Sequence, residues 1–312
     1  MSLKWLTPYE QELSLAFAEA ESILRELPEP FRKPALDYLD KFHALKDNRS
    51  KNYICYLLPF WLQPLAGIET EITRRFAVAN IFGMMYYHLI DACMDEPDKL
   101  MPGQLPLAEL IHLEFVKLYS SCFSENPLFW SYYKKYVNQW AEAVSSETGS
   151  DFYHENPVRM GHKAAQVKLS IAGIMSIAGR EAEIPRLEQA VDTVLVTLQL
   201  LDDWQDWEKD LAEGSYNSLV SIVQTDLQIP GERRPEPEEI RQAITIHGTL
   251  NQLSEHARRN HEELAAIRDL APDLYEFHDF LRNNLEEGAR EIEAKVILLQ
   301  GGGLGYWLSK NI

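Results

Sequence analysis

Acidic side chains gather at the end of an apolar stretch in the second half of the chain. Asp203, Asp206 and Asp210 follow the spacing i, i+3 and i+7. Asp202 lies one turn before Asp206. On an α-helix this spacing places carboxylates on one face, where like charges one turn apart destabilise the helix by roughly 0.2–0.5 kcal/mol per pair. Bound cations would remove the repulsion, and Mg²⁺ prefers carboxylate, water and phosphate oxygens. The spacing therefore indicates a metal site for a phosphorylated ligand.

A second acidic pair supports this interpretation. Asp91 and Asp95 are one turn apart and close the apolar segment 76–90. The first cluster likewise follows an uncharged stretch, residues 194–201. An exposed acidic helix end, with Lys209 as an ion-pair partner, is the alternative for the first cluster taken alone. Two apolar helices that both end in paired carboxylates favour the metal site.

The elements that position these acids are predicted to be helices. Apolar residues recur mostly at three- and four-residue spacing, and no series of alternating valine-rich segments bounded by hairpin turns is found. The fold class is therefore predicted to be all-α. The expected helices cover residues 8–26, 30–46, 52–66, 69–95, 106–123, 127–147, 157–179, 185–212, 216–225, 236–268 and 271–299.

We expect these helices to form a single domain of residues 1–312. The stretch 228–239 is rich in Pro, Glu and Arg, but the helices on both sides have similar apolar content. It is therefore predicted to be a surface loop and not a domain boundary. The C-terminal residues 301–312 begin with glycines and include Tyr306, Trp307 and Leu308, an apolar patch that could fold back as a lid.

Charge and cysteine content limit the classes of partner and compartment. The formal net charge of -18 repels nucleic acid, so no nucleic-acid partner is expected. An anionic substrate would need a local basic pocket or metal ions as intermediaries. The three cysteines, at positions 55, 93 and 122, form no CxxC pair and cannot all pair internally, which indicates a reducing, cytoplasmic location.

Neither secretion nor membrane insertion is expected. The N-terminal residues 1–12 contain proline and glutamate where a signal peptide needs an apolar stretch. The longest charge-free candidate, residues 76–90, is too short to span a bilayer. We therefore expect no transmembrane segment.

Several stretches, taken together, match the motifs of one superfamily. Residues 199–206 read Gln-Leu-Leu-Asp-Asp-Trp-Gln-Asp, with glutamine leading into DDxxD, and residues 206–210 form DxxxD, followed by Gly214 and Tyr216-Asn217. Residues 88–95 place Asp91 and Asp95 at DxxxD spacing. The chain resembles the class I isoprenoid synthase superfamily, which includes trans-prenyltransferases, class I terpene synthases, and squalene and phytoene synthases. The first acidic motif departs from the DDxxD of the chain-elongating enzymes.

The resemblance implies a single large helical bundle with a central substrate cavity, and commonly a homodimer. It implies three Mg²⁺ ions between the two acidic motifs and the substrate diphosphate, with these residues catalytic and metal-binding: Asp91, Asp95, Asp202, Asp206 and Asp210. Residues 48–52 fall where the family has a basic loop, and residues 162–165 fall where the elongating enzymes have Lys-Thr-Ala. Diphosphate contacts are accordingly expected from Arg49, Lys51 and Lys163, although solvated positions explain the first two equally well.

The chemistry implied is the ionisation of an allylic prenyl diphosphate. Metals and basic side chains stabilise the departing diphosphate, and an apolar pocket keeps the carbocation from water. Aromatic faces stabilise a cation by roughly 0.5–2 kcal/mol each. The candidate lining residues, for each of which ordinary core packing is the favoured explanation when it is taken alone, are Phe82, Tyr86, Tyr87, Trp140 and Tyr306.

Two departures favour one branch of the superfamily. Elongating enzymes usually carry Arg-Arg after the first motif and Gly-Lys after the second, where this chain has residues 96–99 (Glu-Pro-Asp-Lys) and Gly214-Ser215. A one-substrate terpene synthase, a carbon–oxygen lyase acting on phosphates, is therefore expected first. A squalene or phytoene synthase-like enzyme, which joins two substrates head to head, comes second because of Gly214 and Tyr216, and an elongating prenyltransferase comes third.

Two alternative hypotheses lie outside the superfamily. A di-iron bundle needs two Glu-x-x-His pairs, and only residues 109–112 fit. The non-enzyme alternative is an inactive helical relative that acts as a partner subunit. Intact acids in both motifs speak against it.

Overall fold

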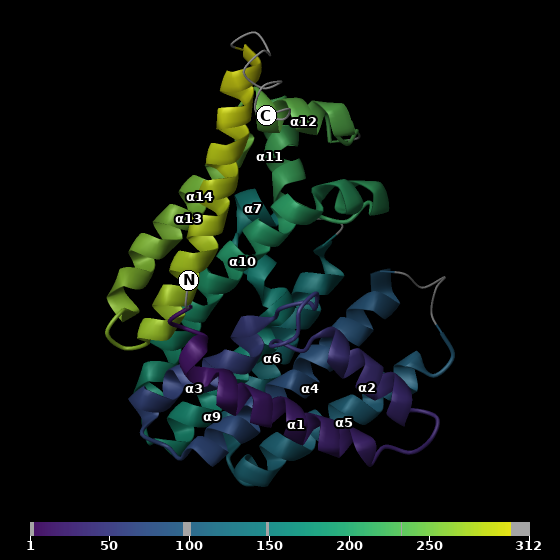
Figure 1. Ribbon diagram of the computed structural model, residues 1–312, viewed down its shortest axis with the longest axis vertical. Helices are drawn as coiled ribbons and strands as arrows, with labels where there is room; N and C mark the ends of the chain where they lie inside the picture. The colour runs from purple at the N-terminus through teal and green to yellow at the C-terminus, as the bar shows by residue number, and fades with distance from the viewer. Residues whose placement is uncertain (1–2, 96–100, 148–149, 232, 301–312) are drawn as a thin grey trace, which may run out of the picture. The chain divides into compact units, whose positions relative to one another are not determined.

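The computed structural model describes residues 3–95, 101–147, 150–231 and 233–300. Helices dominate these ranges, and no strand occurs within them (Figure 1), which confirms the predicted all-α class. The α-helices are α1 Glu10–Arg25, α2 Arg32–Lys41, α3 Tyr53–Ala66, α4 Thr70–Asp95, α5 Gln104–Phe123, α6 Pro127–Ser145, α7 Phe152–Glu155, α8 Val158–Gly161, α9 Leu169–Ile177, α10 Ile184–Glu213, α11 Ser218–Asp226, α12 Pro237–Thr245, α13 Thr249–Leu264 and α14 Pro272–Gln300.

The chain divides into two units that alternate along the sequence. The first unit comprises residues 1–138, 164–188 and 269–274, and the second comprises residues 139–163, 189–268 and 275–312, each within the described ranges. The prediction of a single domain stays a prediction. None of the helices in the described ranges combines the length and the apolar character that a membrane-spanning segment needs.

Helix α4 is the centre of the first unit, where it packs against α1, α3 and α5. Residues 76–85 of α4 are all buried, so this segment is apolar on every side rather than on one stripe. A Cβ atom added at Gly83 would lie 2.8 Å from the Phe115 ring, which shows how closely α4 and α5 approach. The helix continues past this core to Asp91 and Asp95, so the first acidic motif follows directly from a rigid element.

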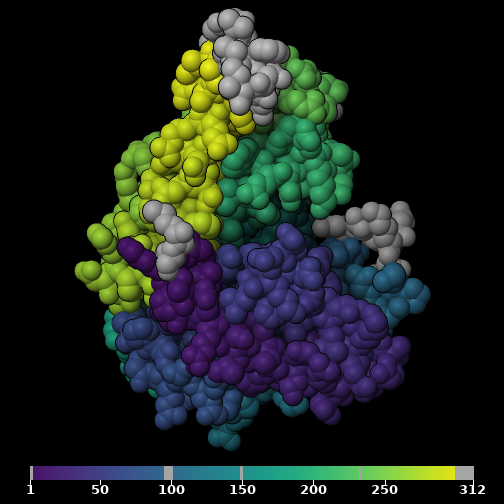
Figure 2. Space-filling model, viewed as in Figure 1, coloured from purple at the N-terminus to yellow at the C-terminus, as the bar shows by residue number. Residues whose placement is uncertain are grey.

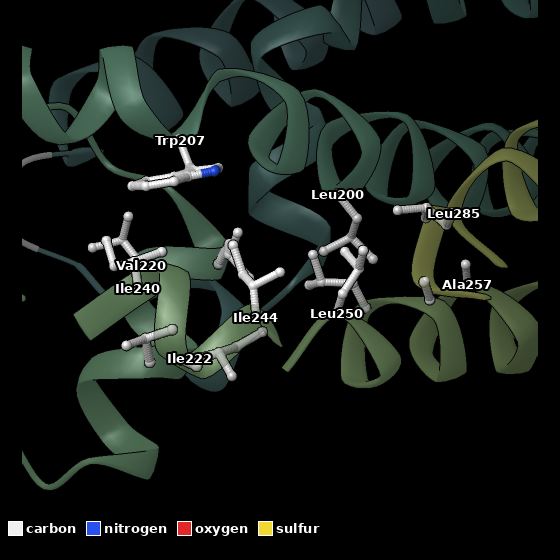
Figure 3. Packing of buried hydrophobic residues seen from close by; sticks show 14 of the residues in the cluster. Leu200, Trp207, Val220, Ile222, Ile240, Ile244, Leu250, Ala257 and Leu285 are labelled. Atoms are coloured by element: carbon white, nitrogen blue, oxygen red, sulfur yellow. The ribbon is translucent and has the colours of Figure 1, made fainter. Parts of the chain in front are cut away.

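Helices of the second unit share one apolar core, to which α7 and α8 contribute one buried residue each (Figure 3). Apolar residues three or four positions apart on α10, α11, α12, α13 and α14 turn toward one another. The labelled members are Leu200, Trp207, Val220, Ile222, Ile240, Ile244, Leu250, Ala257 and Leu285. Asp202 and Asp206 of α10 lie outside this core and are exposed.

Helix α14 also lies close to α10 within the second unit. A Cβ atom at Gly288 would lie 2.0 Å from Cη2 of Trp204, so only glycine leaves room for the indole ring. In Figure 2 the yellow surface of α14 adjoins the green surface of the same unit. No sequence motif indicates this contact.

Two expected helices are interrupted. The expected helix 157–179 consists of α8, a 3₁₀ segment over His162–Lys168 with Ala164 at φ -108° and ψ 22°, and α9. The expected helix 236–268 breaks at Gly248, whose φ of 66° ends α12 and precedes α13. Because the apolar spacing continues through both breaks, periodicity alone predicts one helix where the structure has two.

The expected loop 228–239 ends earlier than predicted. Helix α12 begins at Pro237, after a capping box in which Glu236 and Glu239 each bind the other's backbone. The proposed lid over residues 301–312 lies outside the described residues.

Candidate active site

The acidic row of α10 belongs to the second unit. Asp202 and Asp206 are exposed, and Asp210 is half-buried. Because an α-helix turns about 100° per residue, positions four apart drift by only about 40°, so the three carboxylates lie within about 80° of one another. We call Asp202, Asp206 and Asp210 the acidic row.

Asp203 differs from this row in its burial, although the spacing keeps it within about 60° of Asp206 and about 20° of Asp210 around the helix. Its side chain is 2% exposed. It accepts hydrogen bonds from Gln199 Nε2 at 2.7 Å and from the Ser218 backbone N–H at 2.8 Å. Burial raises the pKa of Asp203 to about 6, although these hydrogen bonds act in the opposite direction. Asp203 therefore fastens α10 to the start of α11.

The carboxylates of the acidic row repel one another. The pKa of Asp202 is raised, first by lost hydration and then by the charges of Asp206 and Asp210. The pKa of Asp210 is raised by burial and also by Asp206, while a hydrogen bond from Asn217 opposes the shift. A cation beside the row would relieve this repulsion.

Lys163 is the predicted diphosphate ligand that lies in the same unit as the acidic row. Its charge lowers the pKa of both Asp202 and Asp210, so it is within electrostatic range of the row. Its Nζ also forms an ion pair with Glu147 Oε1 at 2.5 Å. The spacing argument did not identify Glu147, because the contact joins residues from different parts of the sequence.

In the first unit, Asp91 lies near Tyr38. The pKa of Tyr38 is raised by burial first and then by the charges of Asp91 and Cys93. Asp95 is the last residue of α4, one turn beyond Asp91. Both residues therefore share the end of one helix, as the spacing indicates.

Arg49 is held by a residue of α2, and Lys51 is held by carbonyls of the loop between α2 and α3. Arg49 Nε and Nη2 donate to Asp40 Oδ2 at 3.0 and 2.6 Å, and with Lys46 they lower the pKa of Asp40. Lys51 Nζ donates to the Ala44 carbonyl at 2.6 Å and also to the carbonyls of residues 43 and 46. Either cation would have to leave these partners to bind a diphosphate.

The candidate aromatic lining falls in separate parts of the chain. Phe82 and Tyr87 are buried in the first unit, and Tyr86 stacks on His112 with ring centroids 4.3 Å apart. Trp140 belongs to the second unit. Tyr306 lies outside the described residues. The cavity-lining role of these residues stays a prediction.

A turn with polar walls follows the acidic row. A cavity of about 680 Å³ there is lined by Tyr216, Asn217 and Arg234, among others. Arg234 Nη2 donates to the carbonyls of Gly214 and Ser215 at 2.5 and 3.3 Å. A guanidinium from a distant loop thus sits at the turn that ends α10.

Comparisons with known proteins were informative at the level of structure. No family model matches the chain, and no curated protein matches it. Among solved structures, it is similar to the geranylgeranyl pyrophosphate synthetase from the archaeon Geoglobus acetivorans, with a TM-score of 0.61 and 16% identity, over 91% of this chain and 98% of that chain. The chain has the class I isoprenoid synthase fold. At this identity the likeness establishes the fold and not the reaction.

The isoprenoid synthase fold typically uses Mg²⁺. Within the described ranges, no three His, Cys, Asp or Glu side chains are close enough to hold an ion by themselves. The donor set nevertheless fits, because Mg²⁺ takes one or two carboxylates and completes its shell with water and phosphate oxygens. Asp202, Asp206 and Asp210 supply such carboxylates.

Proposed function

We propose that this chain is a magnesium-dependent class I terpene synthase. It would ionise an allylic prenyl diphosphate to a carbocation, which then cyclises or loses a proton, with release of diphosphate. The observation that carries the proposal is the acidic row, in which burial first and then mutual repulsion raise the pKa of Asp202 and Asp210, beside the charge of Lys163. Three carboxylates on one helix face, within electrostatic range of a lysine, suit a metal–diphosphate ligand.

Each side chain then has a defined part. Asp202, Asp206 and Asp210 would hold Mg²⁺, which would supply positive charge for the diphosphate leaving group. Lys163 would exchange its ion pair with Glu147 for a contact with the diphosphate. Asp91 is proposed as a further magnesium ligand and is tested separately below.

The fold's second candidate reaction is chain elongation. The neighbour by structure is named as a geranylgeranyl pyrophosphate synthetase. Elongating enzymes usually carry a lysine after the glycine that corresponds to Gly214, and this chain has Ser215 instead. Arg234, however, brings a guanidinium to the carbonyls of the same turn. A cation from the loop before α12 could therefore serve where the lysine is missing.

The experiment that separates the two reactions is a substrate panel. The protein is incubated with Mg²⁺ and geranyl, farnesyl, geranylgeranyl or longer diphosphates, each alone and with isopentenyl diphosphate. Hydrocarbon or alcohol from one allylic substrate alone supports the terpene synthase. A dimeric product from one substrate indicates head-to-head condensation, and a strict requirement for isopentenyl diphosphate supports elongation.

The matched variant for the second reaction is Arg234→Ala. If the chain elongates, this change should raise the KM for isopentenyl diphosphate. A terpene synthase that uses one substrate would show no such dependence. Absence of turnover with every substrate would contradict both reactions and favour an inactive relative.

A further inference from the structure

Asn217 joins the acidic row to the helix that follows it. It is the N-cap of α11, with an extended backbone at φ -150° and ψ 127°, and it is 2% exposed. Its Oδ1 accepts hydrogen bonds from the backbone N–H groups of Leu219 and Val220 at 3.0 and 3.2 Å. These contacts begin α11 in the usual way for an asparagine cap.

The other end of the same amide faces α10. Asn217 Nδ2 donates to the Asp203 carbonyl at 2.7 Å and to Asp210 Oδ2 at 2.8 Å. An asparagine amide has two N–H donors and one oxygen with two lone pairs, and all of them are used here. The backbone N–H groups at Oδ1 fix which end of the amide is oxygen, so Nδ2 must face Asp210.

We propose that Asn217 is a positioning residue for Asp210, and that it presents the Asp210 carboxylate to Mg²⁺. This inference rests on the proposed function. The amide binds one carboxylate oxygen, which restricts the side chain to one arrangement and leaves the other oxygen for the ion. A neutral donor does this without the competing charge of a lysine or arginine.

A purely structural role for Asn217 predicts a different result. The start of α11 is also fastened to α10 by the Ser218 N–H bond to buried Asp203. Serine caps a helix about as well as asparagine does. A serine at position 217 would therefore keep the cap, but it lacks the amide group that reaches Asp210.

The test compares Asn217→Ser and Asn217→Thr with two reference variants. Asp210→Asn removes the ligand itself. Ile222→Val shortens a buried side chain of α11, five residues after Asn217. It weakens the packing of α11 without changing a residue that contacts the acidic row. Two capping variants are used so that a folding failure of one leaves the other to measure.

Two readouts are taken. The first is the magnesium concentration that half-saturates diphosphate release. The second needs no turnover: Mn²⁺ binding, followed by electron paramagnetic resonance, in the presence of inorganic diphosphate. Loss of a residue that orients a metal ligand typically lowers metal affinity about 10–100-fold. We expect Asn217→Ser and Asn217→Thr to raise both half-saturating concentrations about 10-fold or more, with turnover recovering at high magnesium, and Ile222→Val to leave them unchanged.

The outcomes separate this inference from the proposed function. If Asp210→Asn impairs metal binding while both capping variants match the wild type, the inference is overturned and the proposed function stands. If both capping variants and Ile222→Val weaken metal binding equally, a structural role explains the effect and the inference is again overturned. A wild-type chain that neither binds Mn²⁺ with diphosphate nor releases diphosphate contradicts the proposed function itself.

Discussion

Neighbouring aspartates of α10 have different surroundings, although they belong to one sequence motif. Adjacent positions on a helix are turned by about 100°, so Asp203 enters the unit while Asp202 faces outward. Asp203 receives hydrogen bonds from Gln199 and Ser218, and Asp202 receives the repulsion of the acidic row. Asp203 is therefore engaged by hydrogen bonds within the unit, and we propose only Asp202, Asp206 and Asp210 as ligands of the ion.

The acidic row leads to a prediction for single ligands. Asp206→Asn removes a charge with little change in shape, and Asp206 is exposed, so the helix should remain intact. We expect magnesium-dependent diphosphate release to fall about 100-fold or more, since a ligand should matter at least as much as its supporting residues. The far-ultraviolet helical signal should be unchanged.

Asp91→Asn tests the other acidic motif in the same way. A comparable loss of diphosphate release, with helical content intact, is expected. Full activity in either variant would show that the carboxylate concerned is not a metal ligand.

Part of the candidate site could be predicted from the sequence. The contacts between residues of different elements could not, for a physical reason. Spacing alone identified the acidic row, because a helix converts intervals of four into one face. It could not identify the part played by Asn217, because that residue acts through a turn between two helices. The basic residue Arg49 was chosen by type and position, and the structure pairs it with Asp40, a contact across nine residues that no motif encodes.

At the scale of elements, a buried chain of polar groups joins α10, α13 and α14. Asn260 Nδ2 donates to Thr197 Oγ1 at 3.0 Å, and Thr197 Oγ1 lies 2.8 Å from His278 Nε2. His278 Nδ1 lies 3.0 Å from His261 Nδ1, and His261 Nε2 lies 3.4 Å from Asp279 Oδ1. When both histidines are neutral, each group in this row can donate one hydrogen bond to the next group, from Asn260 through to Asp279.

The neutral His278 in this row of polar groups predicts that the stability of the protein depends on pH. Burial lowers the pKa of His278 to about 3, aided by His261 and Arg282 and opposed by Asp279. In the unfolded protein His278 takes up a proton near pH 6.5, and in the folded protein it does so only near pH 3. Its contribution to the free energy of unfolding is therefore full above pH 6.5 and is lost as the pH falls toward 3. At pH 5 the loss from this group should be about 2 kcal/mol.

Urea unfolding at several pH values, on the wild type and His278→Asn, measures this loss. The variant should show a shallower decline of the free energy of unfolding between pH 6.5 and 5. The comparison concerns the two slopes, because the substitution also changes the absolute stability. Equal slopes would contradict the assignment of a neutral buried His278.

The contact of α10 with α14 gives a further prediction. A methyl group at position 288 would overlap the indole of Trp204, whose ring atoms lie 2.0–2.7 Å from an ideal Cβ there. Gly288→Ala should destabilise the protein by about 1–3 kcal/mol, as overpacking typically does. Adding Trp204→Phe, which shortens the ring, should recover part of the loss in urea unfolding. An unchanged midpoint for Gly288→Ala would show that the two helices separate without cost.

At the scale of the whole molecule, periodicity predicted the helical class, and the structural likeness confirms the isoprenoid synthase fold. The positions of helix breaks were harder to predict than the class, because the 3₁₀ segment His162–Lys168 keeps the apolar content of a helix. The branch of the superfamily is harder still. It depended on a missing lysine after Gly214, and the structure shows Arg234 reaching that turn from a loop twenty residues away in sequence.

The most direct test of the account is diphosphate release measured against magnesium. The wild type and Asp206→Asn are each given farnesyl, geranyl or geranylgeranyl diphosphate, with magnesium or with a chelator. The account predicts that the wild type releases diphosphate from at least one of these substrates only when magnesium is present, and that Asp206→Asn releases almost none. Release that is independent of magnesium, or equal in the two proteins, would contradict it.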